Sequence, residues 1–350
     1  MTTPPTTQSV IDLCRAQGFA LAGVAPASRS FYDSTFVQWL RDEKHGEMDW
    51  MNRHVDIRLD PTNLIEGATS VICVADRYGG LEDPTPEALD GRVARYARGS
   101  DYHKVMKRRL HKVCDELAGQ NPDETFRACV DTVPLFEREL AAKAGIGAIG
   151  KHTLLIDQGV GSWLLLGAIV TTMDLEPHHG VQPDPCGTCT RCIDACPTAA
   201  ITPWEVDASK CISYLTIEHR SEIDPDYFSA MGQWIFGCDI CQEVCPHNQP
   251  TDRSVAAPVH EAYKERFRDL NVLEVLDWDD QARQDAFRGS SMKRAKLNMI
   301  RRNGVIVAGN ILARRSDPDL LEKLQEIQRN EDEDPLVRST AEVVLHAHHL

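Results

Sequence analysis

The chain has 350 residues, of which 42% are hydrophobic and 26% charged, as in an ordinary globular protein large enough for two or three domains. Its formal net charge of −15 argues against nucleic-acid binding over the whole surface, and no apolar run reaches the ~18 residues that a membrane span requires. Residues 1–8 lack the basic and apolar parts of a secretory signal, so a cytoplasmic protein without a membrane anchor is expected.

Helix and strand signals alternate through the first half of the chain. Apolar positions at helical spacing alternate with short runs of β-branched residues, and several runs end at glycines. The expected helices are 10–17, 36–43, 101–118 and 135–144, and the expected strands are 19–24, 70–75, 126–130, 153–156 and 162–172, with the last two strands paired around Gly159 and Gly161. This order predicts an α/β domain with a mixed sheet. It has neither a G-x-G-x-x-G turn nor a P-loop, so dinucleotide and P-loop nucleotide binding are not indicated.

The second half begins with a proline-rich linker, 176–185, followed by a cysteine-rich module. Beyond it the chain is expected to be helical. Asp317-Pro318 and Asp334-Pro335 each combine an N-cap aspartate with an N1 proline, and the helices they begin, 320–328 and 336–348, resemble one pair of a HEAT-type repeat. One such pair cannot bury its apolar face alone and must dock on its neighbours. The predicted fold is a multidomain α+β and α/β architecture with domains at 1–175, 176–250 and 251–350.

Two cysteine runs carry the strongest chemical signal. The first follows the C-x2-C-x2-C-x3-C-P spacing of bacterial two-cluster ferredoxins, and a second run follows about fifty residues later. The second run lacks its first cysteine, because that position is Ile235, and Cys211 is the only cysteine between the runs. In such ferredoxins the fourth thiolate of a run binds the neighbouring cluster. Two [4Fe-4S] ligand sets are therefore predicted: Cys186, Cys189, Cys192 and Cys245 for the first cluster, and Cys196, Cys211, Cys238 and Cys241 for the second.

The cysteines have other interpretations. A zinc module would use two separated C-x2-C pairs, and disulfides would need an oxidising compartment. Cys211 alone could be a buried free thiol, since cysteine is often buried. The remaining cysteines lie in apolar or helical contexts and are expected in the core: Cys14, Cys73, Cys114 and Cys129. With two clusters the chain would carry single electrons from an external low-potential donor, which the sequence does not identify.

Two cationic patches stand out against the acidic total. The first holds eight Lys/Arg against Asp101 alone: Arg92, Arg95, Arg98, Lys104, Lys107, Arg108, Arg109 and Lys112. The second holds six and no acid: Arg288, Lys293, Arg294, Lys296, Arg301 and Arg302. Both patches are candidate phosphate contacts, although either could equally be the solvated face of a helix.

Several segments, taken together, are similar to the epoxyqueuosine reductase family. They include Arg58-Leu59-Asp60-Pro61, the run from Arg95 to Lys104, Val130-Asp131-Thr132-Val133-Pro134, the run from Cys211 to Glu218, and the run from Phe236 to Pro246. The cysteine runs alone would be shared with any 8Fe ferredoxin. The resemblance is more specific because it extends from about residue 10 to the C-terminus. Ala148 and His247 depart from it, since the family usually has tryptophan at both positions.

The resemblance implies a cobalamin enzyme that reduces epoxyqueuosine to queuosine at the wobble position of tRNA, with cobalamin reduced by the two clusters. It places the proton donor on Asp131, at the end of a predicted strand. Opening an epoxide leaves an alkoxide, and a carboxylic acid in a desolvated site can stay protonated to quench it. Without the resemblance, Asp131 could simply cap a turn.

The other site residues implied are less specific. The candidate cobalamin contacts are Arg58, Asp131, Lys151, His152, Ser213 and Asp239. The His-on cobalamin signature D-x-H-x-x-G appears only as Asp101-Tyr102-His103 followed by Met106, so base-off cobalamin without a histidine ligand is expected. The candidate tRNA contacts are Arg220, Arg288, Lys293, Arg294, Lys296, Arg301 and Arg302.

Two other functions stay open from the sequence. A cytoplasmic reductive dehalogenase on the same scaffold would explain the clusters but not the basic helical tail. A non-enzymatic 8Fe electron-transfer adaptor would explain the cysteines but would leave residues 1–175 without a task. For the tRNA-modifying enzyme that the resemblance implies, a monomer is expected.

Overall fold

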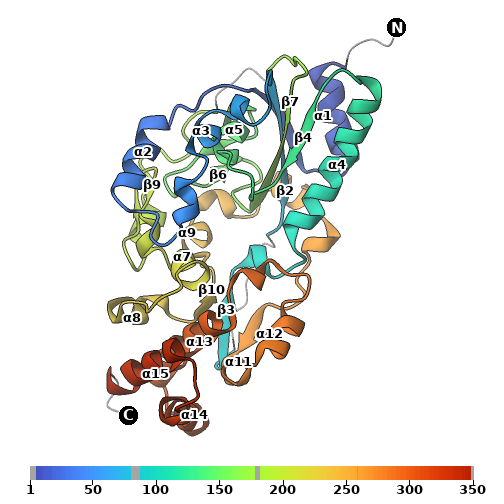
Figure 1. Cartoon of the computed structure of the whole chain (residues 1–350). Coiled ribbons are helices and arrows are strands. Elements are labelled where there is room, and N and C mark those ends of the chain that lie inside the picture. The colour runs from blue at the N-terminus through green and yellow to red at the C-terminus, as the bar shows by residue number, and fades with distance from the viewer. Residues whose placement is uncertain (1–4, 80–86, 178–181, 258, 348–350) are drawn as a thin grey trace.

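The computed structural model describes residues 5–79, 87–177, 182–257 and 259–347 (Figure 1). The linker predicted at 176–185 and the end of the helix predicted at 336–348 fall partly outside these ranges. The structure has an upper sheet domain, a middle region with the cysteines, and a helical tail (Figure 1). None of the helices in these ranges is both long enough and apolar enough to cross a bilayer.

A four-stranded sheet forms the upper domain, in the order β1 (Leu21–Pro26), β2 (Ser70–Arg77), β7 (Leu164–Thr171) and β4 (Phe126–Cys129). All its pairings are antiparallel, so the mixed sheet predicted here is wrong. Alternation of helices and strands along a chain does not determine strand direction, because an antiparallel pair needs no crossover. The strand pairing predicted around Gly159 and Gly161 is also wrong, since β6 (Leu155–Ile156) pairs with β5 (Ala148–Ile149). Only a single bridge, Asp157 to Gly161, remains of it.

Helices cover both faces of this sheet because its central strand is apolar on both sides: every residue of β2 is buried. α1 (Thr7–Ala16) and α4 (Tyr102–Gln120) bury Val10, Met106 and Leu110 on one face. α5 (Glu137–Lys143) packs Leu140 and Ala141 on the other. These helices match their predicted positions within a few residues. The remaining helices of this domain are α2 (Asp33–Arg41) and α3 (Val55–Leu59).

The three sequence segments meet in a second small sheet. β3 (Asp90–Val93) lies between β10 (Trp234–Phe236), which runs parallel to it, and β11 (Asp269–Asn271), which runs antiparallel. Val93, Phe236 and Val272 share one core with the tail helices. The boundaries predicted at 175 and 250 therefore divide the chain, but not its hydrophobic cores.

The cysteine-rich region consists of short elements, as expected for loops that wrap clusters. They are α6 (Arg191–Asp194), β8 (Ile201–Thr202), β9 (Glu205–Val206), α7 (Ile212–Ile217), α8 (Phe228–Met231) and α9 (Ile240–Glu243). β8 and β9 form a hairpin whose tip holds the exposed Trp204.

The tail is built around α13 (Leu297–Leu312), which is buried on nearly all sides. α14 (Pro318–Arg329) and α15 (Pro335–Ala347) form the predicted pair and pack on it. Asp317 caps α14, with its carboxylate accepting from the Leu320 amide. The other tail helices are α10 (Asp252–Ala256), α11 (Val272–Asp277), α12 (Asp280–Ala286) and the 3-10 helix η8 (Ser291–Arg294).

Candidate active site and cysteine centres

The four cysteines predicted for the first cluster line one hollow. Its walls are His152, Pro185, Cys186, Cys189, Arg191, Cys192, Cys245, Pro246 and His247. Three of the cysteines come from the 186–192 loop and α6, and Cys245 comes from the turn after α9. Backbone amides approach the thiols here: the Lys151 amide donates to Cys186 Sγ at 3.3 Å. Amide donors of this kind are a recognised means of tuning the potential of an iron–sulfur cluster.

The four cysteines predicted for the second cluster lie close enough to interact electrostatically. Cys211 interacts with Cys196, Cys238 with Cys211, and Cys241 with both Cys196 and Cys211. Cys241 also interacts with Cys192 of the first set, so the two groups are neighbours. Burial raises the pKa of the Cys238 and Cys241 thiols. Because cysteine binds metal as the thiolate, a metal centre bound here would have to supply the positive charge that favours the ionised form.

Over the described ranges, no three His, Cys, Asp or Glu side chains are grouped as ligands of a single metal ion. A zinc ion at about 2.3 Å from each sulfur would draw four thiolates close together. A [4Fe-4S] cube holds its ligands at four corners and spreads them further apart.

Lys151 belongs to the first cysteine loop. Its Nζ donates to the carbonyl oxygens of Gly187 at 2.7 Å and Cys189 at 2.9 Å, and its side chain is buried. The ammonium also lies 5.6 Å from the centre of the Trp204 ring. These contacts occupy the Lys151 ammonium, which argues against the cobalamin contact that the resemblance implied.

His152, which lines the same hollow, has an unused hydrogen-bond donor. Its Nδ1 accepts from the Leu154 amide at 3.1 Å, which places the ring proton on Nε2. Burial, together with the charge of Arg138, lowers the pKa of His152 to about 4, so the ring is neutral. Nε2 has no hydrogen-bond partner among the described residues and is almost fully buried.

Asp131 lies two residues after the end of β4 and has a left-handed backbone, with a φ of 51°, that non-glycine residues seldom adopt. Its amide donates to Glu137 Oε1 at 2.8 Å, and its Oδ2 lies 2.8 Å from His103 Nε2. The carboxylate is 56% exposed. The desolvated surroundings predicted for this acid are therefore not found, because the turn after β4 leaves the side chain exposed. The exposed region around Asp131 and His103 is called the mouth.

Glu137, which the sequence analysis did not single out, is a second acid of this region. Burial, and then the charge of Asp131, raise the pKa of Glu137 to about 8. It is the first residue of α5 and was hidden inside a predicted helix. Its only local sequence signal is an acid at a helix N-terminus, which usually means dipole stabilisation.

A second hollow lies beside these residues. It is lined by Tyr78, Arg138, Leu154, Leu155, Ser162, Leu164, Leu166 and Gln242. Arg138 donates to Thr153 O at 2.7 Å. Its charge acts on Asp131, Glu137 and His152, so it links the hollow of the first cysteine group to the Asp131 mouth. Arg138 and Tyr78 were not among the predicted site residues.

Arg58 is a further buried cation near this site. Its guanidinium lies 5.9 Å from the ring centres of both Phe36 and Trp50. Burial lowers its pKa while the charge of Glu137 opposes the shift. Its Nε has no hydrogen-bond partner in the parts of the chain described.

Ser213 and Asp239 lie against the second cysteine group. The Ser213 amide donates to Cys211, and Asp239 Oδ2 accepts from the Arg95 amide at 2.7 Å. Burial raises the pKa of Asp239 to about 6. Both residues thus stabilise the segments around the cysteines.

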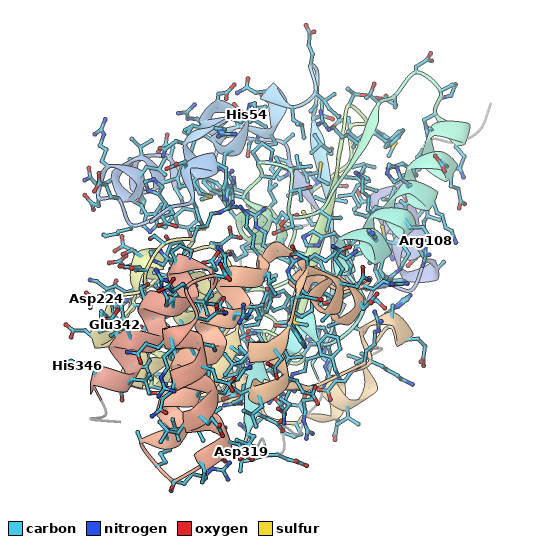
Figure 2. All side chains as sticks on the ribbon, turned by 60° about the horizontal axis from the view of Figure 1, so that its bottom comes forward. His54, Arg108, Asp224, Asp319, Glu342 and His346 are labelled. Atoms are coloured by element: carbon cyan, nitrogen blue, oxygen red, sulfur yellow. The ribbon has the colours of Figure 1, made fainter. Side chains whose placement is uncertain are left out.

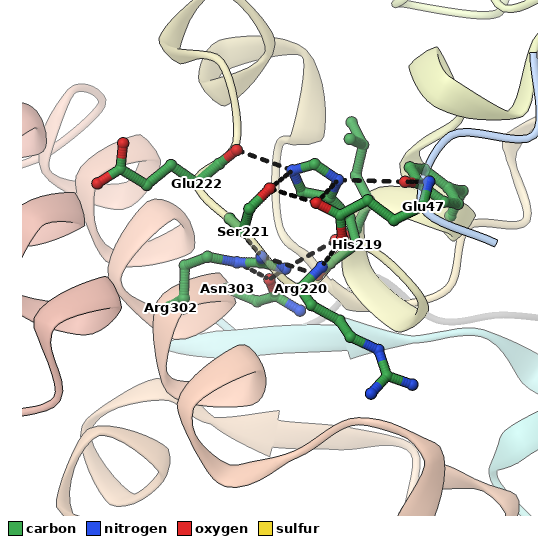
Figure 3. A network of polar contacts seen from close by, with 9 residues as sticks. Glu47, His219, Arg220, Ser221, Glu222, Arg302 and Asn303 are labelled. Carbon is green, nitrogen blue, oxygen red and sulfur yellow. Dashed lines mark hydrogen bonds and ion pairs between the residues drawn. The ribbon is translucent and has the colours of Figure 1, made fainter. Parts of the chain in front are cut away.

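Arg302 is not a surface residue, so its prediction as a tRNA contact is wrong. It is fully buried and donates to the carbonyl oxygens of His219 at 2.9 Å, Ser221 at 2.6 Å and Leu215 at 2.8 Å. Figure 3 shows it beneath the 219–222 loop, whose upper side is bound by Glu47. Arg302 therefore fixes the loop from below.

We expect Arg302→Met to destabilise the protein. Three buried carbonyls would lose their donor, at about 1 kcal/mol or more each, so the free energy of unfolding should fall by roughly 3 kcal/mol. Thermal or denaturant unfolding measures it. Arg220→Met, an exposed change in the same network, should alter it by less than about 0.5 kcal/mol. Equal stability of the two variants would contradict this role of Arg302.

The other cations of the tail divide into paired and unpaired residues. Arg301 forms two 2.7 Å bonds to Glu333 and is mostly buried, which excludes it from the exposed surface. Arg294 binds Glu218 through two 2.8 Å bonds, and Arg288 pairs with Asp285. Among the described residues, no ion pair forms at the exposed candidates Arg220, Lys293 and Lys296. The Arg220 guanidinium extends away from the network around it (Figure 3).

The cations of the first patch also divide into paired residues and exposed residues once the chain is folded. Arg109 is buried against Asp76 at 2.5 Å, Arg98 pairs with Glu265, and Arg92 with Glu243. The exposed cations of this patch all lie on one face of α4: Lys104, Lys107, Arg108 and Lys112. Figure 2 shows Arg108 on the outer side of that helix, far from Glu342 and His346 on α15.

Comparison with known proteins agrees with this geometry. Residues 58–132 match the family model "Epoxyqueuosine reductase QueG, DUF1730", and residues 185–248 match "4Fe-4S double cluster binding domain". The chain is 38% identical to the epoxyqueuosine reductase of Xanthomonas campestris over 338 residues, which cover 93% of this chain and 91% of that protein. It is 38% identical to the Leadbetterella byssophila enzyme over 290 residues, covering 82% and 93%.

Solved structures show the same fold. A selenomethionine-labelled epoxyqueuosine reductase superposes with a TM-score of 0.84 at 25% identity, covering 97% of this chain and 89% of the other. An epoxyqueuosine reductase bound to an epoxyqueuosine-modified tRNA-Tyr stem loop gives a TM-score of 0.83 at 24% identity, covering 97% and 88%.

Proposed function

Because this chain belongs to the epoxyqueuosine reductase family, we propose that it removes the epoxide oxygen of epoxyqueuosine at the tRNA wobble position, using cobalamin and two [4Fe-4S] clusters. Such an oxidoreductase needs a route for electrons and a source of protons at the same place. The observation that carries the proposal is a continuous set of neighbours from Cys186 through His152 and Arg138 to Asp131.

The eight predicted cysteines are the proposed cluster ligands. Their two groups adjoin each other between Cys192 and Cys241, which suits transfer of single electrons from one cluster to the next. All four cysteines of the second group keep partial exposure, whereas Cys192 and Cys245 of the first group are buried, so the second cluster would be the one that receives electrons from an external donor. The first cluster adjoins His152, and through it the second hollow.

Cobalamin fits the residues near the first cluster and Asp131. Arg58 Nε and His152 Nε2 are buried donors without a partner in the described chain, and a corrinoid carries amide and phosphate acceptors that could satisfy them. Glu137, neutral below a pKa of about 8, is a further uncharged donor. When bound, cobalamin would supply a cobalt centre that accepts electrons from the clusters and reacts with the epoxide carbon.

The histidines favour the base-off form without a protein ligand. His103 uses Nδ1 on Asp101 and Nε2 on Asp131, each at 2.8 Å. His152 uses Nδ1 as an acceptor and carries its proton on Nε2. Neither ring therefore has a free nitrogen lone pair for cobalt.

Anaerobic turnover on a tRNA anticodon stem loop containing epoxyqueuosine tests the function directly. After reconstitution with iron, sulfide and cobalamin, and with a chemical reductant, queuosine should form and be detected by mass spectrometry of the nucleosides. Omitting cobalamin should abolish it. Reduction of a halogenated phenol in place of the stem loop would favour the dehalogenase alternative. Failure to bind cobalamin, judged from the absorption spectrum, would favour the electron-transfer adaptor.

The tRNA should be held by local cations rather than by the net charge. A base that reacts at Asp131 must leave its stack, and phosphate contacts nearby would hold the stem while it does. The unpaired exposed cations Lys293 and Lys296 flank Arg294, whose charge acts on Asp131. They are thus the proposed phosphate contacts at the mouth.

We expect Lys293→Ala with Lys296→Ala to raise the tRNA dissociation constant and to flatten its salt dependence by about two phosphates' worth of counterion release. Filter binding at several salt concentrations measures both. Lys107→Ala with Lys112→Ala removes equal charge from α4 and serves as the control. If the α4 pair changed the salt slope and the tail pair did not, the phosphate contacts would lie on α4 instead.

A further inference from the structure

His103 is held in one orientation at the N-terminus of α4. Its Nδ1 lies 2.8 Å from Asp101 Oδ1, and its Nε2 lies 2.8 Å from Asp131 Oδ2. Its ring stacks on Tyr102 with centres 3.9 Å apart. Asp101 also caps α4 by accepting from the His103 amide, so its carboxylate fixes both the helix N-terminus and the His103 ring. The result is an Asp101–His103–Asp131 chain that ends at the open mouth.

The charges around this chain keep a proton on the imidazole. Burial alone would disfavour the imidazolium, but the hydrogen bonds to Asp101 and Asp131 outweigh it and raise the pKa of His103 to about 9. The groups facing the chain from other elements are Tyr96 of the 95–97 turn, Glu137 and Arg138 of α5, and Arg294 of η8. At pH 7 the resting pair is therefore an imidazolium beside an exposed carboxylate.

The proposed reaction needs more protons than Asp131 holds. Removing an epoxide oxygen to leave an alkene consumes two electrons and two protons and releases the oxygen as water. Both protons reach the same oxygen, one after the other, and a single carboxyl group carries only one. A second proton carrier must therefore stand next to Asp131.

We propose that His103 is this carrier: a positioning residue that passes each of the two protons through Asp131 to the leaving oxygen. In each transfer the Nε2–H bond of His103 breaks and an O–H bond forms on Asp131 Oδ2; this O–H bond then breaks as the same proton passes to the leaving oxygen. His103 then takes a proton from water at its partly exposed edge. The electrons come from the reductant through the clusters, so this inference rests on the proposed function.

Binding of the substrate makes the transfer favourable. The resting ion pair is stabilised by water around the exposed Asp131. A base that fills the mouth would expel that water, and desolvation favours the neutral acid and neutral imidazole over two charges. The acid form of Asp131 would thus arise only when there is an oxygen to protonate.

The pH dependence of single-turnover rates tests this role. Since His103 must be protonated, activity should be present below pH 9 and be lost as the pH rises through about 9. His103→Gln should lower the rate by about 10²-fold without changing tRNA affinity. It should also remove this high-pH limb, the loss of activity as the pH rises through about 9. Asp101→Asn preserves the helix cap but weakens the imidazolium, so it should move the limb to lower pH. His111→Gln, on the exposed face of α4, should leave the limb in place.

Histidine-labelled protein, observed by NMR without substrate, gives a readout independent of turnover. The resonance absent from His103→Gln should titrate near pH 9 in the wild type and at lower pH in Asp101→Asn. A His103 that titrates near its ordinary value, or a His103→Gln variant with wild-type rate and pH limb, would overturn the proposal. If His103 titrates near pH 9 as predicted but the modified stem loop is not turned over at any pH, the proposed function is overturned but the charge arrangement is not.

Discussion

Asp131→Asn should lose nearly all turnover of epoxyqueuosine while keeping the fold and both clusters. Asparagine has the same shape, tolerates the left-handed backbone that Asp131 adopts, and can still accept a bond from His103. It cannot carry a proton to the leaving oxygen. General acid catalysis is typically worth about 10²- to 10⁴-fold, and this loss should appear in the single-turnover rate rather than in tRNA affinity.

Asp123→Asn is the matched control for this variant, because Asp123 lies in the turn at the other end of β4 and is exposed. It makes the same chemical change near the opposite end of β4 and should retain wild-type turnover. Iron and cobalamin contents should match in both variants. A wild-type rate in Asp131→Asn, measured with pre-reduced protein, would remove Asp131 from the proton path and leave Glu137 as the acid nearest to the mouth.

The sequence predicted best what is decided by local spacing. Short gaps between cysteines bring their side chains around one centre wherever the loop lies, so the first hollow could be foreseen from residues 186–196. Helix ends were predicted almost as well, since Gly18 and Asp317 act on their own helices. Strand direction was not, because pairing depends on residues far away in the chain.

Charge pairing was the hardest feature to foresee. The run at 288–302 contains no acid, yet Arg294 finds Glu218 and Arg301 finds Glu333 once the chain is folded. Arg302 satisfies carbonyls of a loop about eighty residues earlier. Like-charged neighbours in a sequence can thus face different partners, and only their three-dimensional surroundings separate a surface cation from a buried one.

The active-site residues show the same limit. His103 was noted only as part of an incomplete cobalamin-ligand motif, and its bond to Asp131 joins residues 28 positions apart. In the sequence, Glu137 was only one acid in a predicted helix. In the folded structure, burial raises its pKa to about 8. The chemistry of both depends on what is packed around them rather than on their own identity.

Cys211→Ala should remove one cluster and abolish turnover. Cys211 stands in for the cysteine missing at Ile235, and it lies among the other three thiols of the second group. With three ligands the second cluster should be lost, and iron should fall from about eight to about four per chain. Electrons would then have one cluster instead of two, and the EPR signal of the reduced protein should simplify accordingly.

Cys114→Ala, which removes a buried thiol of the sheet domain that lines neither hollow, is the matched control and should keep full iron content. Rescue of the cluster by Cys211→Ser, whose oxygen is a poorer ligand for iron, should be partial at most. Full iron and both reduced-cluster signals in Cys211→Ala would show that Cys211 is a free thiol. The second cluster would then need a ligand other than cysteine, and Asp239, buried between Cys238 and Cys241, would be the side chain to test next.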